Sequence, residues 1–156
     1  MAVASANETQ LNLTVTQHVN ASPQQVFDAL LDPKLVCRWL GPRSMVEACE
    51  VITLEPRVGG RYRLKMVRRA DSPMGPGDLF VAGVYRQIDR PNRLVYSWSW
   101  DHQPHESQVT YDLKPHAGGT EVTLTHDGLA SIESQQSHGR GWTASLQQLA
   151  DILSAE

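Results

Sequence analysis

The sequence HGRGWTASLQQLADIL, at residues 138–153, determines how the rest of the chain must be arranged. Apolar side chains recur there at helical spacing, and they are Trp142, Leu146, Leu149 and Leu153. Mainly polar side chains lie on the other faces, so the pattern predicts an amphipathic helix. Such a helix is stable when its apolar stripe packs on another surface. The rest of the chain must therefore supply that surface.

A β-sheet is the expected surface, because most of residues 45–127 alternates between apolar and polar side chains. The expected strands cover residues 11–19, 45–54, 61–67, 79–88, 93–100, 107–114 and 120–127. Short connections after residue 55 favour antiparallel pairing of neighbouring strands. One face of each clear strand is apolar and the other is polar. This pattern favours a single curved sheet with one side in water over a sandwich of two sheets.

Two short helices are expected between the first two strands. Ser22 can cap the first helix, Pro23 suits its first position, and Gln25 can complete a capping box. Asp32 and Pro33 end this helix, and residues 34–40 are expected to form the second one. Both helices lie where they can help to cover the apolar face of the sheet.

The start of the terminal helix is open to two interpretations, because Gly139 and Gly141 are poor helix formers. In the first, one long helix includes both glycines, and they allow a close approach to the sheet or a bend that leaves room for a ligand. In the second, the helix starts at Trp142, and residues 131–140 form a separate short helix or a loop.

Length, composition and charge limit the classes of function. The chain has 156 residues, of which 40% are hydrophobic and 20% charged. These values predict one globular domain at residues 11–154 after a flexible tail at residues 1–10. A net charge of −3 without a basic run argues against nucleic-acid binding. No signal peptide and no membrane-spanning run are recognised, so we expect a cytoplasmic protein.

Neither the cysteines nor the acidic and histidine residues predict a metal site. Cys37 and Cys49 lie outside any CxxC pair and far from metal-ligand spacing, so two free thiols are expected. Residues 101–106 (DHQPHE) gather residue types that can bind metals, but turns favour these residues anyway. We therefore expect no metal and no cofactor.

A set of ring and thioether side chains is predicted to line a cavity between the terminal helix and the sheet. These side chains combine apolar bodies with a few polar atoms that can orient a ligand. The set comprises Trp39, Tyr62, Met66, Trp98, Trp100, Tyr111, His126, His138 and Trp142. The alternative is that the rings simply fill the space. His126 is also a candidate for a catalytic base, although a structural histidine is favoured, and no other catalytic residue is identified.

The order of elements and several stretches of sequence resemble the AHSA1-like (activator of Hsp90 ATPase homologue) branch of the START/Bet v 1-like (SRPBCC) superfamily. The stretches are residues 22–27 with Trp39, then 58–62, 83–89, 91–98, 121–129 and 141–149. The resemblance implies an α+β helix-grip fold, in which a curved seven-stranded antiparallel sheet wraps around a long C-terminal helix, with two short helices after the first strand. It also implies an internal pocket, but it carries over no catalytic motif.

We therefore expect a protein that binds a small hydrophobic or aromatic ligand in a cavity between the C-terminal helix and the sheet. One alternative is a cyclase- or hydrolase-type enzyme that uses His126 and pocket tyrosines. Another is a stress-response or co-chaperone-like accessory domain that binds a protein, which the polar outer strand faces disfavour. A binding role is favoured over catalysis. The sequence leaves open whether the chain is an enzyme and whether it forms a homodimer.

Overall fold

The computed structural model describes residues 11–73 and 75–154. The tail expected at residues 1–10 lies outside these residues. The elements in chain order are β1 (Leu11–Val19), α2 (Pro23–Leu31), α3 (Val36–Trp39), β2 (Val46–Leu54), β3 (Arg61–Arg68), β4 (Gly77–Asp89), β5 (Arg93–Trp100), β6 (Gln103–His116), β7 (Gly119–Leu129) and α4 (Ile132–Ser154). Among the described helices, none combines the length and the apolar character that crossing a bilayer requires.

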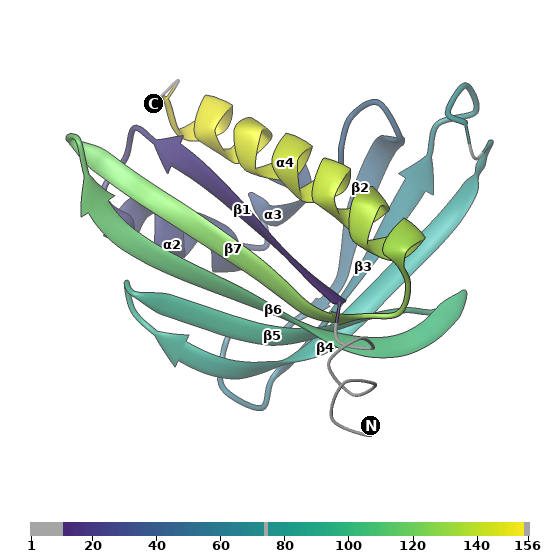
Figure 1. Cartoon of the computed structure of the whole chain (residues 1–156), viewed down its shortest axis with the longest axis horizontal. Helices are drawn as coiled ribbons and strands as arrows, with labels where there is room; N and C mark the ends of the chain where they lie inside the picture. The colour runs from purple at the N-terminus through teal and green to yellow at the C-terminus, as the bar shows by residue number, and fades with distance from the viewer. Residues whose placement is uncertain (1–10, 74, 155–156) are drawn as a thin grey trace, which may run out of the picture.

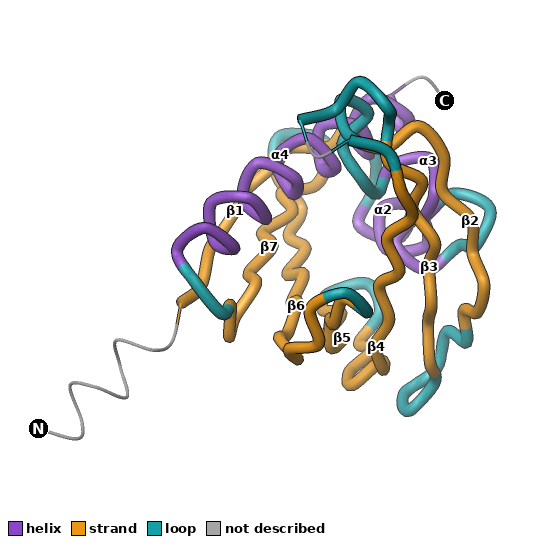
Figure 2. Tube along the Cα trace, turned by 90° about the vertical axis from the view of Figure 1, so that its right-hand side faces the viewer, coloured by secondary structure: helices purple, strands orange, loops and turns teal. Residues whose placement is uncertain are grey.

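The strands form one antiparallel seven-stranded sheet in the order β1-β7-β6-β5-β4-β3-β2. Consecutive strands from β2 to β7 are neighbours, and β1 joins the far edge by pairing with β7. The sheet curves around one side of α4, while α2 and α3 close part of the same concave side (Figures 1 and 2). The predicted α+β helix-grip architecture, with two short helices after the first strand, is confirmed.

The long helix α4 contacts the sheet through the predicted stripe, since Trp142, Leu146, Leu149 and Leu153 are all buried. The helix runs without a break from Ile132 to Ser154, so one long helix includes both glycines, as in the first interpretation. A short helix or loop at residues 131–140 is therefore wrong. The close approach expected at the glycines is not found, because a Cβ atom at Gly139 would meet only Leu13 Cδ2 at 3.9 Å and one at Gly141 would meet nothing within 4 Å. Packing of the stripe outweighs the low helix propensity of the two glycines.

A polar side chain of α4 also ties the helix to the turn after α3. The Gln148 side-chain nitrogen donates to the carbonyl oxygens of Trp39 and Gly41 at 2.8 and 3.0 Å. Its side-chain oxygen accepts from the backbone nitrogen of Arg43 at 3.1 Å. These bonds satisfy backbone groups that the four-residue helix α3 leaves open at its C-terminal end. The position of α3 therefore depends on α4.

Two expectations about the chain need correction. The turn expected at residues 101–106 is shorter, because β6 starts at Gln103, which pairs with Trp100 across the hairpin. The expected free thiols are wrong, because Cys37 and Cys49 form a disulfide with a Cα–Cα distance of 5.2 Å. The fold brings α3 alongside β2, and a separation of 12 residues carries no motif that predicts the bond.

We expect the Ser22→Ala substitution to lower the free energy of unfolding by about 1 kcal/mol, because Ser22 caps α2. Its hydroxyl accepts from the backbone nitrogen of Gln25 at 3.2 Å, and the Gln25 side chain accepts from the backbone nitrogen of Ser22 at 3.0 Å. Chemical denaturation of both proteins measures the difference. The matched control is Ser44→Ala, at an exposed serine whose side chain has no hydrogen bond to a described residue. Equal losses in the two variants would contradict the capping role.

Candidate functional site

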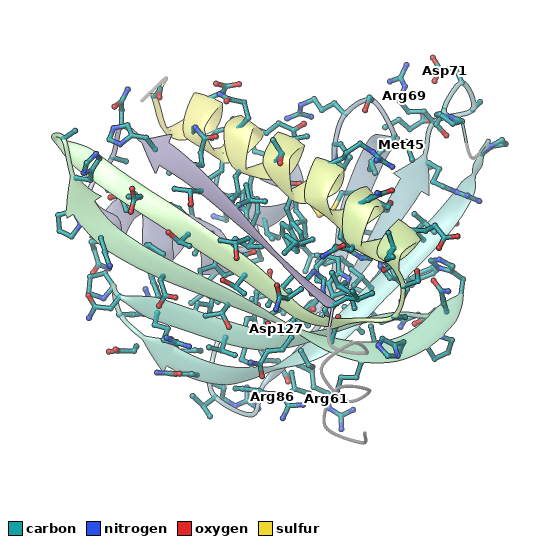
Figure 3. All side chains as sticks on the ribbon, viewed as in Figure 1. Met45, Arg61, Arg69, Asp71, Arg86 and Asp127 are labelled. Atoms are coloured by element: carbon teal, nitrogen blue, oxygen red, sulfur yellow. A yellow bond between two sulfur atoms is a disulfide. The ribbon has the colours of Figure 1, made fainter. Side chains whose placement is uncertain are left out.

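The aromatic cluster, as we call it, consists of Tyr62, Tyr85, Tyr96, Trp98, Trp100, Tyr111, His126, His138 and Trp142. These rings extend from strands β3 to β7 and from α4 into the concave side of the sheet. Trp98 is central, with ring centroids 5.0 Å from Trp142 and 5.8 Å from His126. Trp100 and His138 are half-buried, and the other members are buried. Figure 3 draws all described side chains on the ribbon, and side chains fill the region between α4 and the sheet.

Two of the predicted lining residues lie at the margin of the aromatic cluster. Trp39 meets Tyr111 edge to face at 6.5 Å and donates its indole N–H to the Ala29 carbonyl oxygen at 3.2 Å. Met66 is buried and lies beside Gly41, in the turn after α3. Both side chains belong to the hydrophobic core. Their role in binding therefore stays a prediction.

Tyr85 and Tyr96 were absent from the predicted lining set. Tyr96 alternates with Trp98 on β5, so the period of the strand was a usable signal for it. Tyr85 lies in β4, where a bulge interrupts the pairing between Tyr85 and Gln87. A shift of that kind changes which side chains face inward, and the sequence alone does not reveal it.

The Tyr62 ring lies across the neighbouring strand β4 at a position where that strand has a glycine. Tyr62 pairs with Gly83, and a Cβ atom at Gly83 would come within 2.7 Å of the Tyr62 ring. The absence of a side chain lets the ring lie over β4. The Tyr62 hydroxyl then donates to the carbonyl oxygen of Ser97 on β5 at 2.6 Å. This arrangement fixes the direction of the tyrosine.

His126 lies in a chain of hydrogen bonds that crosses the sheet. The Trp142 indole nitrogen donates to His126 Nδ1 at 2.9 Å. Nδ1 is therefore an acceptor, and the neutral ring carries its proton on Nε2. That nitrogen is 2.7 Å from Ser107 Oγ, and the hydroxyl of Ser107 is 3.2 Å from the carbonyl oxygen of Trp98, to which it can donate. Each side chain in this series of hydrogen bonds thus has a consistent donor or acceptor role.

This arrangement is the reverse of a serine–histidine catalytic dyad. In such a dyad, the nitrogen that faces the serine must be free of its proton in order to accept one. Here the Trp142 N–H occupies the lone pair of His126 Nδ1, so the proton of the neutral ring is on Nε2 and faces Ser107. Neither ring nitrogen keeps a free lone pair for a substrate. The geometry therefore gives no support to His126 as a general base.

Burial and neighbouring rings hold both histidines in the neutral form. Burial, with a smaller contribution from His138, lowers the pKa of His126 from 6.5 to about 3. Burial also lowers the pKa of His138, against a hydrogen bond to the Ser134 carbonyl oxygen that raises it. Trp100 Nε1 donates to His138 Nε2 at 3.0 Å, so a second tryptophan–histidine pair repeats the first. A proton on His138 Nε2 would break that bond.

The tyrosine hydroxyls stay protonated at ordinary pH. Burial raises the pKa of Tyr62, Tyr85, Tyr96 and Tyr111 above the usual value. The hydroxyl oxygens of Tyr96 and Tyr111 are 2.6 Å apart, and either can donate to the other. One proton of this pair has no further acceptor among the described residues. These tyrosines can therefore donate hydrogen bonds, but they are poor acids and bases.

Trp98 differs from the other three tryptophans, because its indole N–H has no acceptor among the described residues. Trp39, Trp100 and Trp142 each donate to a protein atom. Trp98 itself is only 4% exposed. A buried donor without a partner costs about 1–3 kcal/mol, so proteins seldom retain one without a reason.

The space expected beneath α4 is occupied mainly by the rings themselves. Trp142 packs against Trp98 and meets Tyr111 edge to face at 6.3 Å. A small cavity of about 10 Å³ remains elsewhere, between α2, α3 and strands β2 to β5. Its walls are formed by Leu30, Val36, Leu40, Leu54, Tyr62, Leu64, Tyr85, Tyr96 and Trp98. A large cavity between α4 and the sheet is thus not confirmed, and the remaining space suits about one water molecule.

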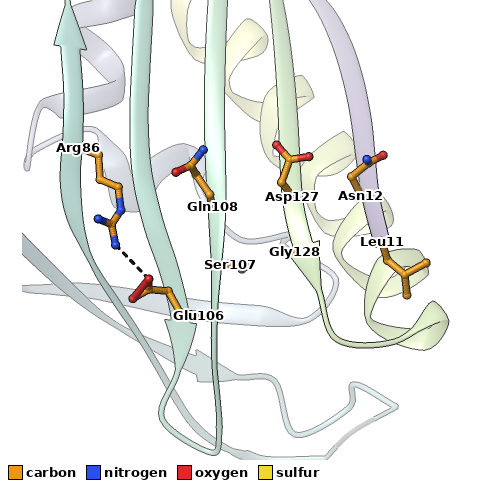
Figure 4. Close-up of a pocket in the computed structure, with 8 residues that line it drawn as sticks. All are labelled: Leu11, Asn12, Arg86, Glu106, Ser107, Gln108, Asp127 and Gly128. Atoms are coloured by element: carbon orange, nitrogen blue, oxygen red, sulfur yellow. Dashed lines mark hydrogen bonds and ion pairs between the residues drawn. The ribbon is translucent and has the colours of Figure 1, made fainter. Parts of the chain in front are cut away.

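An open hollow of about 620 Å³ lies on the face of the sheet that is turned away from α4 (Figure 4). Arg86, Gln108, Asp127 and Asn12 cross it in a row, and Arg86 pairs with Glu106 at 3.0 Å. No aromatic ring lines it. The described residues also contain no group of histidine, cysteine, aspartate or glutamate side chains that could hold a metal. The aromatic cluster and its small cavity are therefore the candidate site.

Comparison with known proteins identifies the fold and the family. The family model described as activator of Hsp90 ATPase homolog 1-like protein matches residues 20–154. A crystal structure from Chromobacterium violaceum has a TM-score of 0.81 and 25% identity, and the match covers 91% of this chain and 96% of that one. An AHSA1 protein from Silicibacter pomeroyi has a TM-score of 0.75 and 25% identity, covering 93% and 99%.

A protein from Rhodobacter sphaeroides has a TM-score of 0.71 and 26% identity, and the match covers 92% of this chain and 93% of that one. No curated protein matches the chain. The similar structures thus agree on the architecture over nearly the whole chain, and they name no ligand.

Proposed function

Because the chain belongs to the family of activator of Hsp90 ATPase homolog 1-like proteins, we propose that it binds a small hydrophobic or aromatic molecule. The family shares its architecture with many small-ligand carriers, and that likeness supports a binding role only in general terms. The specific support is the wall formed by Tyr62, Tyr85, Tyr96 and Trp98, which lines the small cavity. Rings of this kind provide large apolar surfaces together with a few polar atoms.

The proposed ligand enters by enlarging the existing cavity. The tyrosines and Trp98 lie on paired strands, whereas Leu30, Val36 and Leu40 come from α2, α3 and the residue that follows α3. The helix α3 has only four residues and no side-chain cap at its N-terminus. The Cys37–Cys49 disulfide and the Gln148 side chain hold α3 in position, so the side chains of this aliphatic wall can move more easily than the backbone. Ligand binding is therefore proposed to displace the side chains of Leu30, Val36 and Leu40 while the ring-bearing wall stays in place.

We expect that a bound aromatic compound will raise the melting temperature by about 3–6 °C at ten times its dissociation constant. The measurement is a thermal-shift screen of small neutral aromatic compounds, followed by titration of each hit. In the Val36→Phe variant the added ring fills the cavity, and the shift should disappear. Val58→Phe makes the same substitution at a position that is 62% exposed, and it should leave the shift unchanged.

Circular dichroism checks that both variants fold. Loss of binding in folded Val36→Phe but not in Val58→Phe would support the proposed site. If no compound stabilises the wild-type protein, or if Val36→Phe binds as well as the wild type does, the proposed function is contradicted.

A further inference from the structure

We infer that the ligand of this site is an uncharged aromatic compound with a hydrogen-bond acceptor oxygen, such as an aromatic ketone or quinone, and that Trp98 Nε1 donates to that oxygen. This inference rests on the proposed function and makes it more specific. It follows from which polar groups of the aromatic cluster are already bonded within the protein and which are not.

Trp98 provides the first argument. Each of the other three tryptophans donates its indole N–H to a protein acceptor at 2.9–3.2 Å. The Trp98 N–H has no such acceptor among the described residues, although Trp98 is 96% buried (4% exposed) and lines the cavity. An indole nitrogen donates and never accepts. A ligand that forms a hydrogen bond with the Trp98 N–H must therefore carry an acceptor atom.

The tyrosines beside Trp98 provide the second argument. Tyr96 lines the same cavity, and its hydroxyl shares a hydrogen bond with that of Tyr111. Two hydroxyls in one bond leave one proton over, and no described residue accepts it. The Tyr62 hydroxyl already donates to Ser97. The tyrosine pair can thus offer one proton to a ligand, and the Trp98 N–H can only donate, so a ligand oxygen satisfies both groups.

The absence of charge provides the third argument. The cavity walls consist of leucine, valine, tyrosine and tryptophan side chains and hold no charged group. A ligand cation or carboxylate would lose its hydration there without gaining an ion pair, which is costly. The raised pKa values of the tyrosines also keep these hydroxyls from becoming anionic partners for a cation. An uncharged acceptor such as a carbonyl oxygen meets both conditions.

Matched probes of nearly equal shape test the inference. They are 1-indanone, which carries a carbonyl oxygen, indane, which lacks it, and 1-aminoindane, which is a cation at neutral pH. Titrations of the full chain are followed by ¹H–¹⁵N NMR, in which each tryptophan gives its own indole signal. The missing signal in Trp98→Phe identifies that of Trp98.

We expect 1-indanone to bind about five- to tenfold more tightly than indane, because it completes one neutral hydrogen bond. The cation should bind more weakly than either. The Trp98 indole proton should move downfield with 1-indanone and not with indane. Trp98→Phe should bind 1-indanone and indane with about equal affinity.

The outcomes separate this inference from the proposed function. Equal binding of 1-indanone and indane by the wild type overturns the acceptor requirement and leaves the binding function intact. A ketone preference that survives in Trp98→Phe overturns the assignment to Trp98. If Trp98→Phe fails to fold, the Trp98 indole signal is assigned in the wild type by through-bond and NOE experiments, and an unmoved Trp98 signal with 1-indanone then overturns the assignment. Failure of all three probes to bind contradicts both proposals.

Discussion

The free energy of unfolding is expected to fall by about 3 kcal/mol between pH 6.5 and pH 4 through His126 alone. The folded protein holds the pKa of His126 at about 3, whereas an unfolded chain has the ordinary value of 6.5. Between these two values the unfolded state binds a proton that the folded state does not bind. Stability is therefore unaffected by His126 above pH 6.5, declines as the pH falls, and levels off below about pH 3.

Burial is the main cause of the lowered pKa, because a proton would place a charge in a side chain that is 0% exposed, and His138 adds a smaller contribution. A proton on Nδ1 would also oppose the Trp142 N–H. His138 contributes in the same direction, because burial lowers its pKa as well. The two tryptophan–histidine pairs thus make the α4 contact with the sheet sensitive to acid.

Denaturation by urea at a series of pH values measures this dependence in the wild type and in His126→Gln. A glutamine can still accept from Trp142 and donate to Ser107, but it does not titrate. The variant should lose most of the slope between pH 6.5 and pH 4. His102→Gln is the control, at an exposed histidine in the turn before β6, and it should retain the slope. Identical slopes in the wild type and His126→Gln would refute the assignment.

Reduction of the Cys37–Cys49 disulfide should lower the free energy of unfolding by about 3 kcal/mol. The bond closes a loop with a sequence separation of 12, and the stabilisation comes mainly from restricting the unfolded chain. A loss of this size corresponds to a fall of about 6–12 °C in the melting temperature. Thermal unfolding with and without dithiothreitol measures the change.

The variant with both Cys37→Ser and Cys49→Ser separates the bond from other effects of the reductant. Its melting temperature should match that of the reduced wild type and should not respond to dithiothreitol. Thiol titration of the unfolded, unreduced wild type should find the cysteines blocked. Two reactive thiols in that sample, or an unchanged melting temperature after reduction, would argue against a stabilising disulfide.

Periodicity was enough to predict the architecture. The alternation in β3 and β7 and the helical spacing from Trp142 to Leu153 are strong local signals, and each matches the buried face. In β5 the apolar face is buried as expected, but Val95 and Ser97 on the opposite face are buried as well. The cap at Ser22 was equally local and is confirmed. The boundaries of β6 were missed because its first residues are polar and include a proline.

The details of the site depended on contacts that no local pattern encodes. The sequence placed His126 on an inner face, but the acceptor role of its Nδ1 comes from Trp142, which lies 16 residues away on another element. The disulfide and the unbonded Trp98 N–H likewise follow from three-dimensional placement. How much room the rings leave also depends on their packing, which the composition of a strand face does not determine.

The bonds from Gln148 to the turn after α3 have a consequence for how the protein acquires its structure. They connect residues 109 and 107 positions apart, and β1 finds its sheet partner only in β7. On a ribosome, the early segments must therefore wait for partners that are synthesised last. Such distant pairings slow folding and keep intermediates exposed. Nascent chains released before Gln148 should remain more open to proteases and chaperones than complete ones.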